Sequence, residues 1–308
     1  MELIKMAADC GVSAVKFQTR DNKALYTRDF YDSPYASEQA FGPTYGSHRE
    51  ALEMPLSAYP DLKQYAESLG LVFFSTPFDF PSADFLARLD VPCFKIASGD
   101  LLNIPLIKHI AAVGKPVIVS TGGATLNDVV RVWQDIAWRQ GQLAIMQCTA
   151  AYPVQAEEMN LSVIELYRRV FPDNVIGLSD HFSGILSGPL AYMLGSRIFE
   201  KHVTLNHAMK GTDHAFSLER EGLRRFVRDL HRTPLMLGDG VKHPYESEAP
   251  GLRKMQKSIT IWRDLPAGHE LAEADFQYKS PGGGIPPYRT AAYIGRRLRQ
   301  PVVADHVL

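Results

Sequence analysis

Residues 94–121, FKIASGDLLNIPLIKHIAAVGKPVIVST, contain two short apolar runs, FKIAS and VIVST, separated by a segment whose apolar residues have helical spacing. This is the pattern of a βα unit whose parallel strand is buried on both faces. The repetition of the pattern predicts an α/β fold, a (β/α)8 TIM barrel. Five more runs of this kind occur along the chain: AVKFQ (14–18), LVFFSTP (71–77), AIMQCT (144–149), VIGLSD (175–180) and IFEKHVT (198–204).

Each run ends on polar residues, and these lie together in a barrel because the C-terminal ends of the strands form its active site. Two lysines, several hydroxyls and two histidines beside carboxylates indicate a site for a phosphorylated anion and a divalent cation. The residues at the predicted strand ends are Lys16, Gln18, Thr76, Lys95, Ser98, Ser120, Thr149, Ser179, Asp180, His181, Lys201 and His202.

Only seven such runs are present, whereas a closed barrel needs eight. Residues 1–10 have the spacing of an amphipathic helix, and Gly11 stands where a helix stop belongs. We therefore expect the first strand to be missing and the chain to be short by one βα opening. The alternative is a native seven-stranded open barrel, which would leave two strand edges unpaired.

The composition bounds the class of protein. The chain has 308 residues, a net charge of −1 and a pI of about 6.8, which does not favour a nucleic-acid groove or an anionic membrane surface. No apolar run reaches the roughly 18 residues of a membrane span. The start lacks the features of a secretory signal, and Cys10, Cys93 and Cys148 match no zinc pattern. These features predict a cytoplasmic protein with buried thiols.

The composition changes near residue 241. Residues 241–253 are polar and carry two prolines, which predicts a linker, and short β-type runs with turn signals follow. We expect a barrel domain over 1–240 and a small β-rich domain over 254–308. Within the barrel, the long aromatic segment between residues 18 and 71 is either a functional lid or a packed surface excursion.

Lys16 and Lys95 are candidates for the anion site. A buried lysine without a partner is costly, so a phosphate or carboxylate would be the natural counter-charge. The alternative for each is a structural pair with a carboxylate. Ser98, Ser120 and the glycines of S-T-G-G (120–123), ahead of a helix that should begin near Thr125, favour the anion.

The chain resembles the sialic acid synthase family over nearly its whole length. The resemblance rests on AVKFQ, FFSTPFD, VPCFKIASGDLLNIPLI, GKPVIVSTGGATL, QCTAAYPVQAEEMNL, IGLSDH, FEKHVTLN and KGTDHAFSLE, and 257–308 resemble the antifreeze-like (SAF) domain of these enzymes. Members are transferases that condense phosphoenolpyruvate with N-acetylmannosamine or a related amino sugar to a nine-carbon 2-keto acid. The family's opening strand, with a catalytic glutamate and an Asn-His pair, is not matched.

The resemblance implies roles for particular residues. It implies catalytic roles for Lys16, Lys95, His181 and His202, with the two histidines holding Mn²⁺ or Mg²⁺. From position alone, these histidines could equally be satisfied core groups, and Asp180 and Glu200 could orient them or pair with Lys201 or a helix end. The implied phosphoenolpyruvate site is Lys16, Thr76, Lys95, Ser98, Ser120 and Ser179, and the implied sugar site is Gln18, Tyr152 and Asp213.

The resemblance also implies a domain-swapped homodimer, with each C-terminal domain over the partner's barrel. Several stretches are similar to the animal-type enzymes that use the 6-phosphate of the sugar, whereas Ser280 and Ala150 depart from other members. The acceptor therefore stays open among N-acetylmannosamine, its 6-phosphate and a bacterial 2,4-diacetamido sugar. Two other functions remain: a Schiff-base aldolase that uses Lys16 or Lys95, and an inactive truncated homologue that acts as a binding protein.

Overall fold

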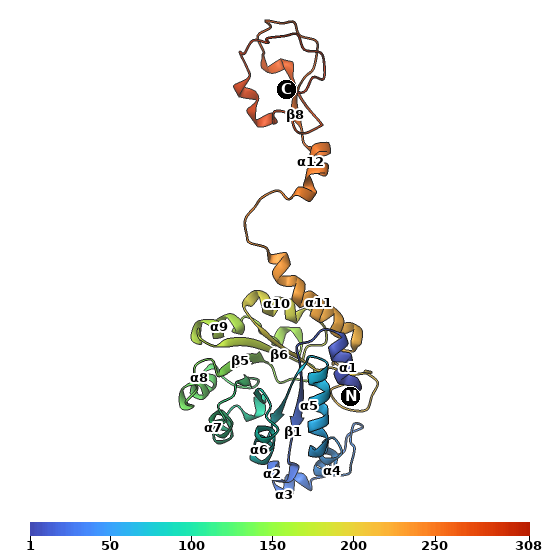
Figure 1. Cartoon of the computed structure of the whole chain (residues 1–308), viewed down its shortest axis with the longest axis vertical. Helices are drawn as coiled ribbons and strands as arrows, with labels where there is room; N and C mark the ends of the chain where they lie inside the picture. The colour runs from blue at the N-terminus through green and yellow to red at the C-terminus, as the bar shows by residue number, and fades with distance from the viewer. The chain divides into compact units, whose positions relative to one another are not determined.

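The computed structural model describes all 308 residues, which form two compact units, 1–237 and 238–308. The first unit contains one parallel sheet in which the strands pair in chain order (Figure 1). The predicted TIM-barrel type of fold with a small β-rich C-terminal domain is confirmed. The seven strands are β1 (Ala14–Thr19), β2 (Val72–Pro77), β3 (Phe94–Ile96), β4 (Val117–Ser120), β5 (Leu143–Cys148), β6 (Val175–Asp180) and β7 (Ile198–Lys201).

The inner strands β2 to β6 are largely buried on both faces, as the unbroken apolar runs predict, whereas the outer strands β1 and β7 are only partly buried. Every residue of β5 is buried, and Phe94 and Ile96 of β3 have no exposed surface. Helices follow one another around the outside of the sheet (Figure 1). They are α1 (Glu2–Asp9), α2 (Asn22–Leu25), α3 (Arg28–Tyr31), α4 (Tyr45–Glu50), α5 (Tyr59–Ser68), α6 (Phe80–Arg88), α7 (Ile104–Ala112), α8 (Leu126–Asp135), α9 (Val163–Val170), α10 (Ser187–Leu194) and α11 (Arg220–Leu237).

The helix starts follow local side-chain chemistry. Asp79 accepts a hydrogen bond from the Ser82 N–H at the start of α6, and Thr125 forms a reciprocal capping box with Asp128 at the start of α8. The α8 start lies where the sequence predicted it. Because all seven strands run parallel, the polar residues that follow their C-terminal ends gather at one edge of the sheet.

The sheet is not closed. Its order runs from β1 to β7 without pairing between these two outer strands. Helix α1, which the sequence predicted, packs against α5 and α11, and its Met6 and Ala7 share an apolar cluster with Phe226 of α11. Val15 of β1 and Phe199 of β7 pack against this same cluster. The two outer strands are therefore linked by apolar packing and not by a hydrogen-bonded ladder.

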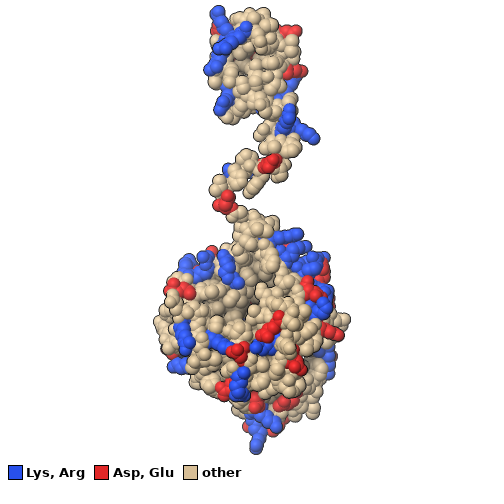
Figure 2. Space-filling model, viewed as in Figure 1, with Lys and Arg blue, Asp and Glu red and all other residues tan.

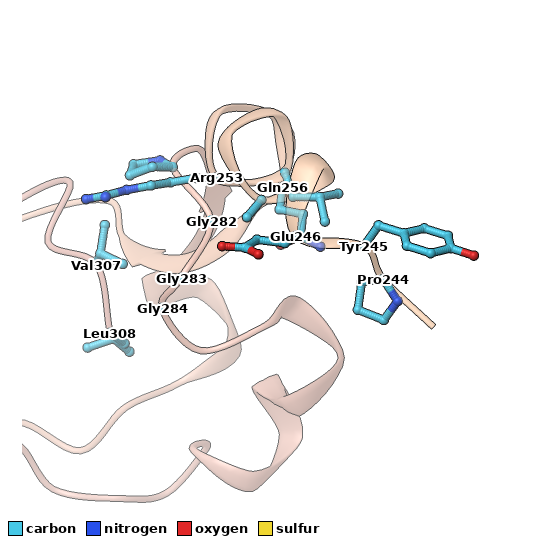
Figure 3. Close-up of a pocket in the computed structure, with 13 residues that line it drawn as sticks. Pro244, Tyr245, Glu246, Arg253, Gln256, Gly282, Gly283, Gly284, Val307 and Leu308 are labelled. Carbon is cyan, nitrogen blue, oxygen red and sulfur yellow. The ribbon is translucent and has the colours of Figure 1, made fainter. Parts of the chain in front are cut away.

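The second unit has its own small core. Strands β8 (Ser258–Ile261) and β9 (Phe276–Lys279) pair antiparallel, and Ile259, Ile261 and Leu265 are among its buried residues. Helix α12 (Ala249–Met255) begins within the segment 241–253 that we propose as the linker and ends two residues beyond it. A groove of about 1030 Å³ lies between this segment, the Gly282–Gly284 turn and the C-terminal Val307 and Leu308 (Figure 3).

The surface carries charges of both signs. On the face that Figure 2 shows, basic and acidic side chains are interspersed, without an extended patch of one sign. No helix is long and apolar enough to cross a membrane.

Candidate functional site

One cavity of about 500 Å³ opens at the C-terminal ends of the barrel strands. This volume suits small-molecule ligands. The residues assigned from the sequence to the phosphoenolpyruvate, sugar and metal sites all line it: Lys16, Gln18, Thr76, Lys95, Ser98, Ser120, Tyr152, Ser179, His181, His202 and Asp213. The strand ends thus bring together side chains that are up to about two hundred residues apart in the sequence.

Two lysines share one carboxylate at the base of this cavity. The Nζ atoms of Lys16 and Lys95 lie 3.9 Å and 3.7 Å from Oε1 of Glu200. Burial raises the pKa of Glu200, but the two lysine charges outweigh it and bring this pKa to about 2, so the carboxylate is ionised at neutral pH. Two positive charges and one negative charge leave a net positive site.

Hydroxyl and amide groups surround the lysines. Lys16 donates a hydrogen bond of 3.3 Å to Thr76 Oγ1, and Lys95 donates one of 2.5 Å to Ser120 Oγ. The Ser98 hydroxyl accepts the Gly122 N–H at 2.9 Å. A Cβ at residue 122 would lie 2.8 Å from both the Ala150 Cβ and the Ser98 Oγ, so glycine is required for this close approach. Cations with flanking hydroxyls are suited to a phosphate or carboxylate.

His181 and His202 lie side by side, with ring centroids 5.3 Å apart. The Nδ1 of His181 is 2.9 Å from the Thr149 carbonyl, which can only accept, so Nδ1 carries the proton and Nε2 is free to bind a metal. Burial is the main cause that lowers the pKa of His202 to about 4, so its ring is neutral, as a metal ligand must be.

These two imidazoles fit a divalent cation that keeps open positions for water or substrate. The structure contains no group of three or more His, Cys, Asp or Glu side chains that could hold a metal. A cation bound here would therefore have two protein ligands from this chain. Asp213 Oδ2 lies 3.6 Å from Nδ1 of His202 and can orient that ring.

The predicted sugar-side residues lie next to the histidines. The ring of Tyr152 is 4.2 Å from that of His181, and burial raises the pKa of its hydroxyl to about 12, so the hydroxyl stays a hydrogen-bond donor. Gln18 accepts a hydrogen bond from Arg20 through Oε1. Together with the Asp213 carboxylate, these groups can bind the hydroxyls of a sugar.

Of the roles considered for Asp180, the structure shows the pair with Lys201 and not the support of the histidines. Asp180 Oδ2 pairs with Lys201 Nζ at 3.0 Å, and both side chains are almost fully buried. Neither residue lines the cavity. The reason is the alternation of a strand: Ser179 and His181 face one side of β6, and Asp180 faces the other.

Three features of the site differ from, or add to, what the sequence predicted. Glu200, considered as a support of the histidines or a partner of Lys201 or a helix end, is instead the shared partner of Lys16 and Lys95, and its spacing of two from His202 is a signal that both face the cavity. Cys148, predicted only as a buried thiol, lies 3.9 Å from His181 Nδ1. The third is the wall from the aromatic segment, which folds as three short helices and contributes Tyr35, Phe41, Tyr45, His48, Arg49 and Leu52.

The chain matches known proteins in both of its units. The pattern of the NeuB family matches residues 3–242, and that of the SAF domain matches residues 256–308. N-acetylneuraminate-9-phosphate synthase of Homo sapiens is 33% identical over 99% of this chain and 86% of its own length. N,N'-diacetyllegionaminic acid synthase of Legionella pneumophila is 33% identical over 100% of this chain and 88% of its own.

A solved structure shows the same architecture. The N-acetylneuraminic acid synthetase of Leptospira borgpetersenii superposes with a TM-score of 0.67 at 29% identity, over 81% of this chain and 83% of the other. The sequence and structural similarities therefore agree on one family, while the sugars named for the relatives differ.

Proposed function

The chain belongs to the NeuB family, and we propose that it condenses phosphoenolpyruvate with N-acetylmannosamine, its 6-phosphate or a related amino sugar to a nine-carbon 2-keto acid. A phosphoenolpyruvate-dependent synthase of nine-carbon keto sugars is the function that the family supports. The observation that carries the proposal is one cavity in which Lys16 and Lys95 lie beside Glu200 and the histidine pair.

The lysine end of the cavity would hold phosphoenolpyruvate. Lys16 and Lys95 supply positive charge, and Thr76 of β2, Ser98 after β3, Ser120 of β4 and Ser179 of β6 supply hydroxyls. Charge-assisted contacts of this kind fix both the phosphate and the carboxylate of the substrate. Glu200 reduces the net positive charge, so that the two lysines can lie close together before the substrate binds.

The histidine end would hold the open-chain aldehyde of the amino sugar. C3 of phosphoenolpyruvate attacks the aldehyde carbon, and a C–C bond forms. As positive charge develops at C2, water adds to this carbon. The bond between C2 and the oxygen that bridges to phosphorus then breaks, inorganic phosphate leaves, and the oxygen from water becomes the 2-keto group. The chain contributes proximity and fixed charge at both ends of the reacting pair.

We propose that His181 and His202 hold Mn²⁺ or Mg²⁺ through nitrogen atoms that face the cavity. When bound, a divalent cation polarises the aldehyde carbonyl. Asp213 orients His202, and the Thr149 carbonyl fixes the tautomer of His181. The Tyr152 ring packs against His181 and would limit the positions of that ring.

A product assay tests this proposal. The full chain is incubated with phosphoenolpyruvate, Mn²⁺ and each of the three acceptors, and the products are identified by mass spectrometry. A nine-carbon 2-keto acid with at least one acceptor, together with an equal amount of inorganic phosphate, is the expected result. No product with any of the three would overturn the proposed synthesis and favour a protein that only binds sugar.

A Schiff-base aldolase remains the second candidate because of one observation. Burial lowers the pKa of Lys16 more than the Glu200 carboxylate raises it. A lowered lysine pKa favours the neutral amine that attacks a carbonyl. Borohydride reduction in the presence of pyruvate should leave the chain unlabelled if the condensation proposed above is right, and labelling at Lys16 would support the aldolase.

We also propose a homodimer. The end of α11 supports it, since Leu235 and Met236 are 79% and 83% exposed. Exposed apolar groups of this size are typical of surfaces that another chain covers. Light scattering at micromolar concentration should give twice the 34.3 kDa mass of the chain, and a monomer at all concentrations would contradict the proposal.

A further inference from the structure

A second cationic cluster lines the same cavity and is not used by the reaction described above. It consists of Arg20, which follows β1, and Arg49 of α4, with Glu53 as their shared carboxylate. Arg20 Nη1 lies 3.1 Å from Glu53 Oε1, and Arg49 Nη2 lies 3.7 Å from the same atom. Glu53 does not line the cavity, so the two guanidinium groups are the charges that the cavity meets here.

The charges of this cluster do not balance. Two guanidinium groups face one carboxylate, which leaves one positive charge in a partly buried place. Burial lowers the pKa of Arg20, and the charge of Arg49 lowers it further, as expected when two cations lack sufficient counter-charge. The Arg49 Nε atom is buried and has no hydrogen-bond partner. A buried donor without a partner is costly, and the one carboxylate contact of Arg49, at 3.7 Å, is longer than a direct hydrogen bond, so its guanidinium group lacks counter-groups within this chain.

The groups around the arginines are arranged to bind an anion. Arg20 is held over the Phe78 ring, with Cζ 3.9 Å from the ring centroid, and it donates to Gln18. The Nδ1 of His48 accepts the Phe41 N–H at 3.2 Å, so His48 carries its proton on Nε2 and can donate. Planar guanidinium groups bind the oxygens of a phosphate in pairs. The cluster has the donors of a phosphate site.

In the proposed function Lys16 and Lys95 bind phosphoenolpyruvate, which leaves the arginine cluster as a site for an anionic group of the other substrate. We infer that the acceptor is a phosphorylated amino sugar, whose phosphate, on the carbon farthest from the aldehyde, is bound by Arg20 and Arg49. This inference rests on the proposed function. The aldehyde end then faces the histidine pair while the phosphate end faces the arginine cluster.

The test compares N-acetylmannosamine 6-phosphate with N-acetylmannosamine at saturating phosphoenolpyruvate. The wild-type chain should have the higher kcat/KM with the phosphorylated sugar. Arg49→Met should lower kcat/KM for that sugar by about 20- to 100-fold, because charge-assisted contacts are lost, and change the value for the other sugar by less than about threefold. For Arg49→Lys, kcat/KM with the phosphorylated sugar should lie between the values of the wild type and of Arg49→Met, since lysine keeps the charge but not the paired donors. Arg131→Met, on the exposed face of α8, is the matched control.

Two results would overturn the inference. One is a wild-type preference for the unphosphorylated sugar, and the other is an equal loss for both sugars in Arg49→Met, which would mean that the arginine only supports the fold. Calorimetric binding of the same two sugars separates this question from the proposed function. If the chain makes no product but binds the phosphorylated sugar more tightly in an Arg49-dependent way, the synthase proposal fails and the phosphate site stands. If both sugars bind with equal affinity, the proposal of a phosphate site at Arg20 and Arg49 is wrong.

Discussion

The carboxylate of Glu200 sets the electrostatics of the site because it is the one acid shared by Lys16 and Lys95. It is ionised at neutral pH, and both lysines reach it only at distances near 4 Å, longer than a direct hydrogen bond. The lysines therefore keep donors for a substrate anion. A site of this type binds the anion through groups that are already in position.

Replacement of Lys95 by Ala tests the anion site. Lys95 lies 2.5 Å from Ser120 Oγ and is almost fully buried, so the loss of its charge should weaken phosphoenolpyruvate binding. We expect KM for phosphoenolpyruvate to rise by about 10- to 100-fold, and KM for the sugar by less than about threefold. Steady-state kinetics with each substrate varied in turn provide the measurement. Equal effects on both constants would mean that the lysine is structural.

The metal proposal predicts a pH dependence of Mn²⁺ binding. Burial lowers the pKa of His181, but its hydrogen bonds with Cys148 and the Thr149 carbonyl outweigh burial and raise this pKa above 6.5. The pKa of His202 is about 4, so only His181 has to lose a proton near neutral pH. Since the metal binds neutral imidazole, the apparent affinity should fall about tenfold per pH unit below the pKa of His181.

Electron paramagnetic resonance of free Mn²⁺ measures this affinity without any turnover. His181→Ala and His202→Ala should each weaken binding, whereas His243→Ala, in the second unit, should leave it unchanged. An affinity that is flat between pH 8 and pH 6, or full binding by both site variants, would contradict the assignment of these two ligands.

The candidate site was largely predictable from the strand ends. The residues assigned to the phosphoenolpyruvate, sugar and metal sites all line the cavity, because parallel strands place their C-terminal ends at one edge, whereas Thr149, Asp180 and Lys201 of the predicted strand ends do not. Glu200 was not assigned to the lysines, because sequence alone does not say which acid pairs with which base. Arg49 and His48 could not be found, since they come from a segment without strand or helix periodicity, and only tertiary packing brings it over the cavity.

At the scale of elements, β6 and β7 are tied together directly behind the histidines. Asp180 and Lys201 lie opposite each other in the register of the two strands, and their ion pair is buried. Each is the chain neighbour of a histidine. The pair therefore holds the spacing of His181 and His202 from the opposite side of the sheet.

Lys201→Met should be strongly destabilising because it leaves Asp180 buried and uncompensated. We expect a loss of about 3 kcal/mol in the free energy of unfolding, and part of it should be recovered in the double variant Asp180→Asn/Lys201→Met. Urea unfolding provides the measurement. Lys5→Met is a matched control, since Lys5 lies 2.9 Å from Asp9 but on the surface, and its loss should cost less than about 1 kcal/mol. An equal loss in the free energy of unfolding for Lys201→Met and Lys5→Met would show that burial does not make the Asp180–Lys201 pair more important for stability than a surface pair.

The strands and the longer helices were predictable from the sequence, but the way in which the outer strands β1 and β7 approach each other was not. All seven strands and helix α1 follow from apolar runs, glycine stops and capping residues. The packing of Val15 and Phe199 on one cluster beside α1 was not predictable, because it depends on how the outer strands curve toward each other. The three short helices between residues 22 and 50 were also missed, since four- to six-residue helices are too short to show periodicity.

At the scale of the whole molecule, the second unit carries its own electrostatic support. Although burial of Asp275 raises its pKa, hydrogen bonds from the Ala272 N–H, His269 and Arg263 outweigh burial and bring this pKa to about 2. A carboxyl group with a lowered pKa in the folded state stabilises the fold above its ordinary pKa of 3.8 and loses this contribution as the pH falls toward 2.

We therefore expect residues 238–308 to be uniformly stable from pH 7 to about pH 4 and to lose stability below that. Asp275→Asn should cost about 2 kcal/mol at pH 7 and remove most of this acid dependence. Hydrogen exchange of the β8 and β9 amides reports on this unit alone. Asp305→Asn, whose partner Lys279 is on the surface, is the control. The same acid profile in the wild type and in Asp275→Asn would show that another group is responsible.

The central claim is that the two ends of one cavity join phosphoenolpyruvate to a sugar aldehyde with C–O cleavage. Phosphoenolpyruvate labelled with ¹⁸O in the oxygen that bridges C2 and phosphorus tests it most directly, with the acceptor that gives product and analysis of both products by mass spectrometry. The account predicts that the label appears in inorganic phosphate and that the new 2-keto oxygen comes from water. Label retained in the nine-carbon acid would mean P–O cleavage and would contradict the mechanism.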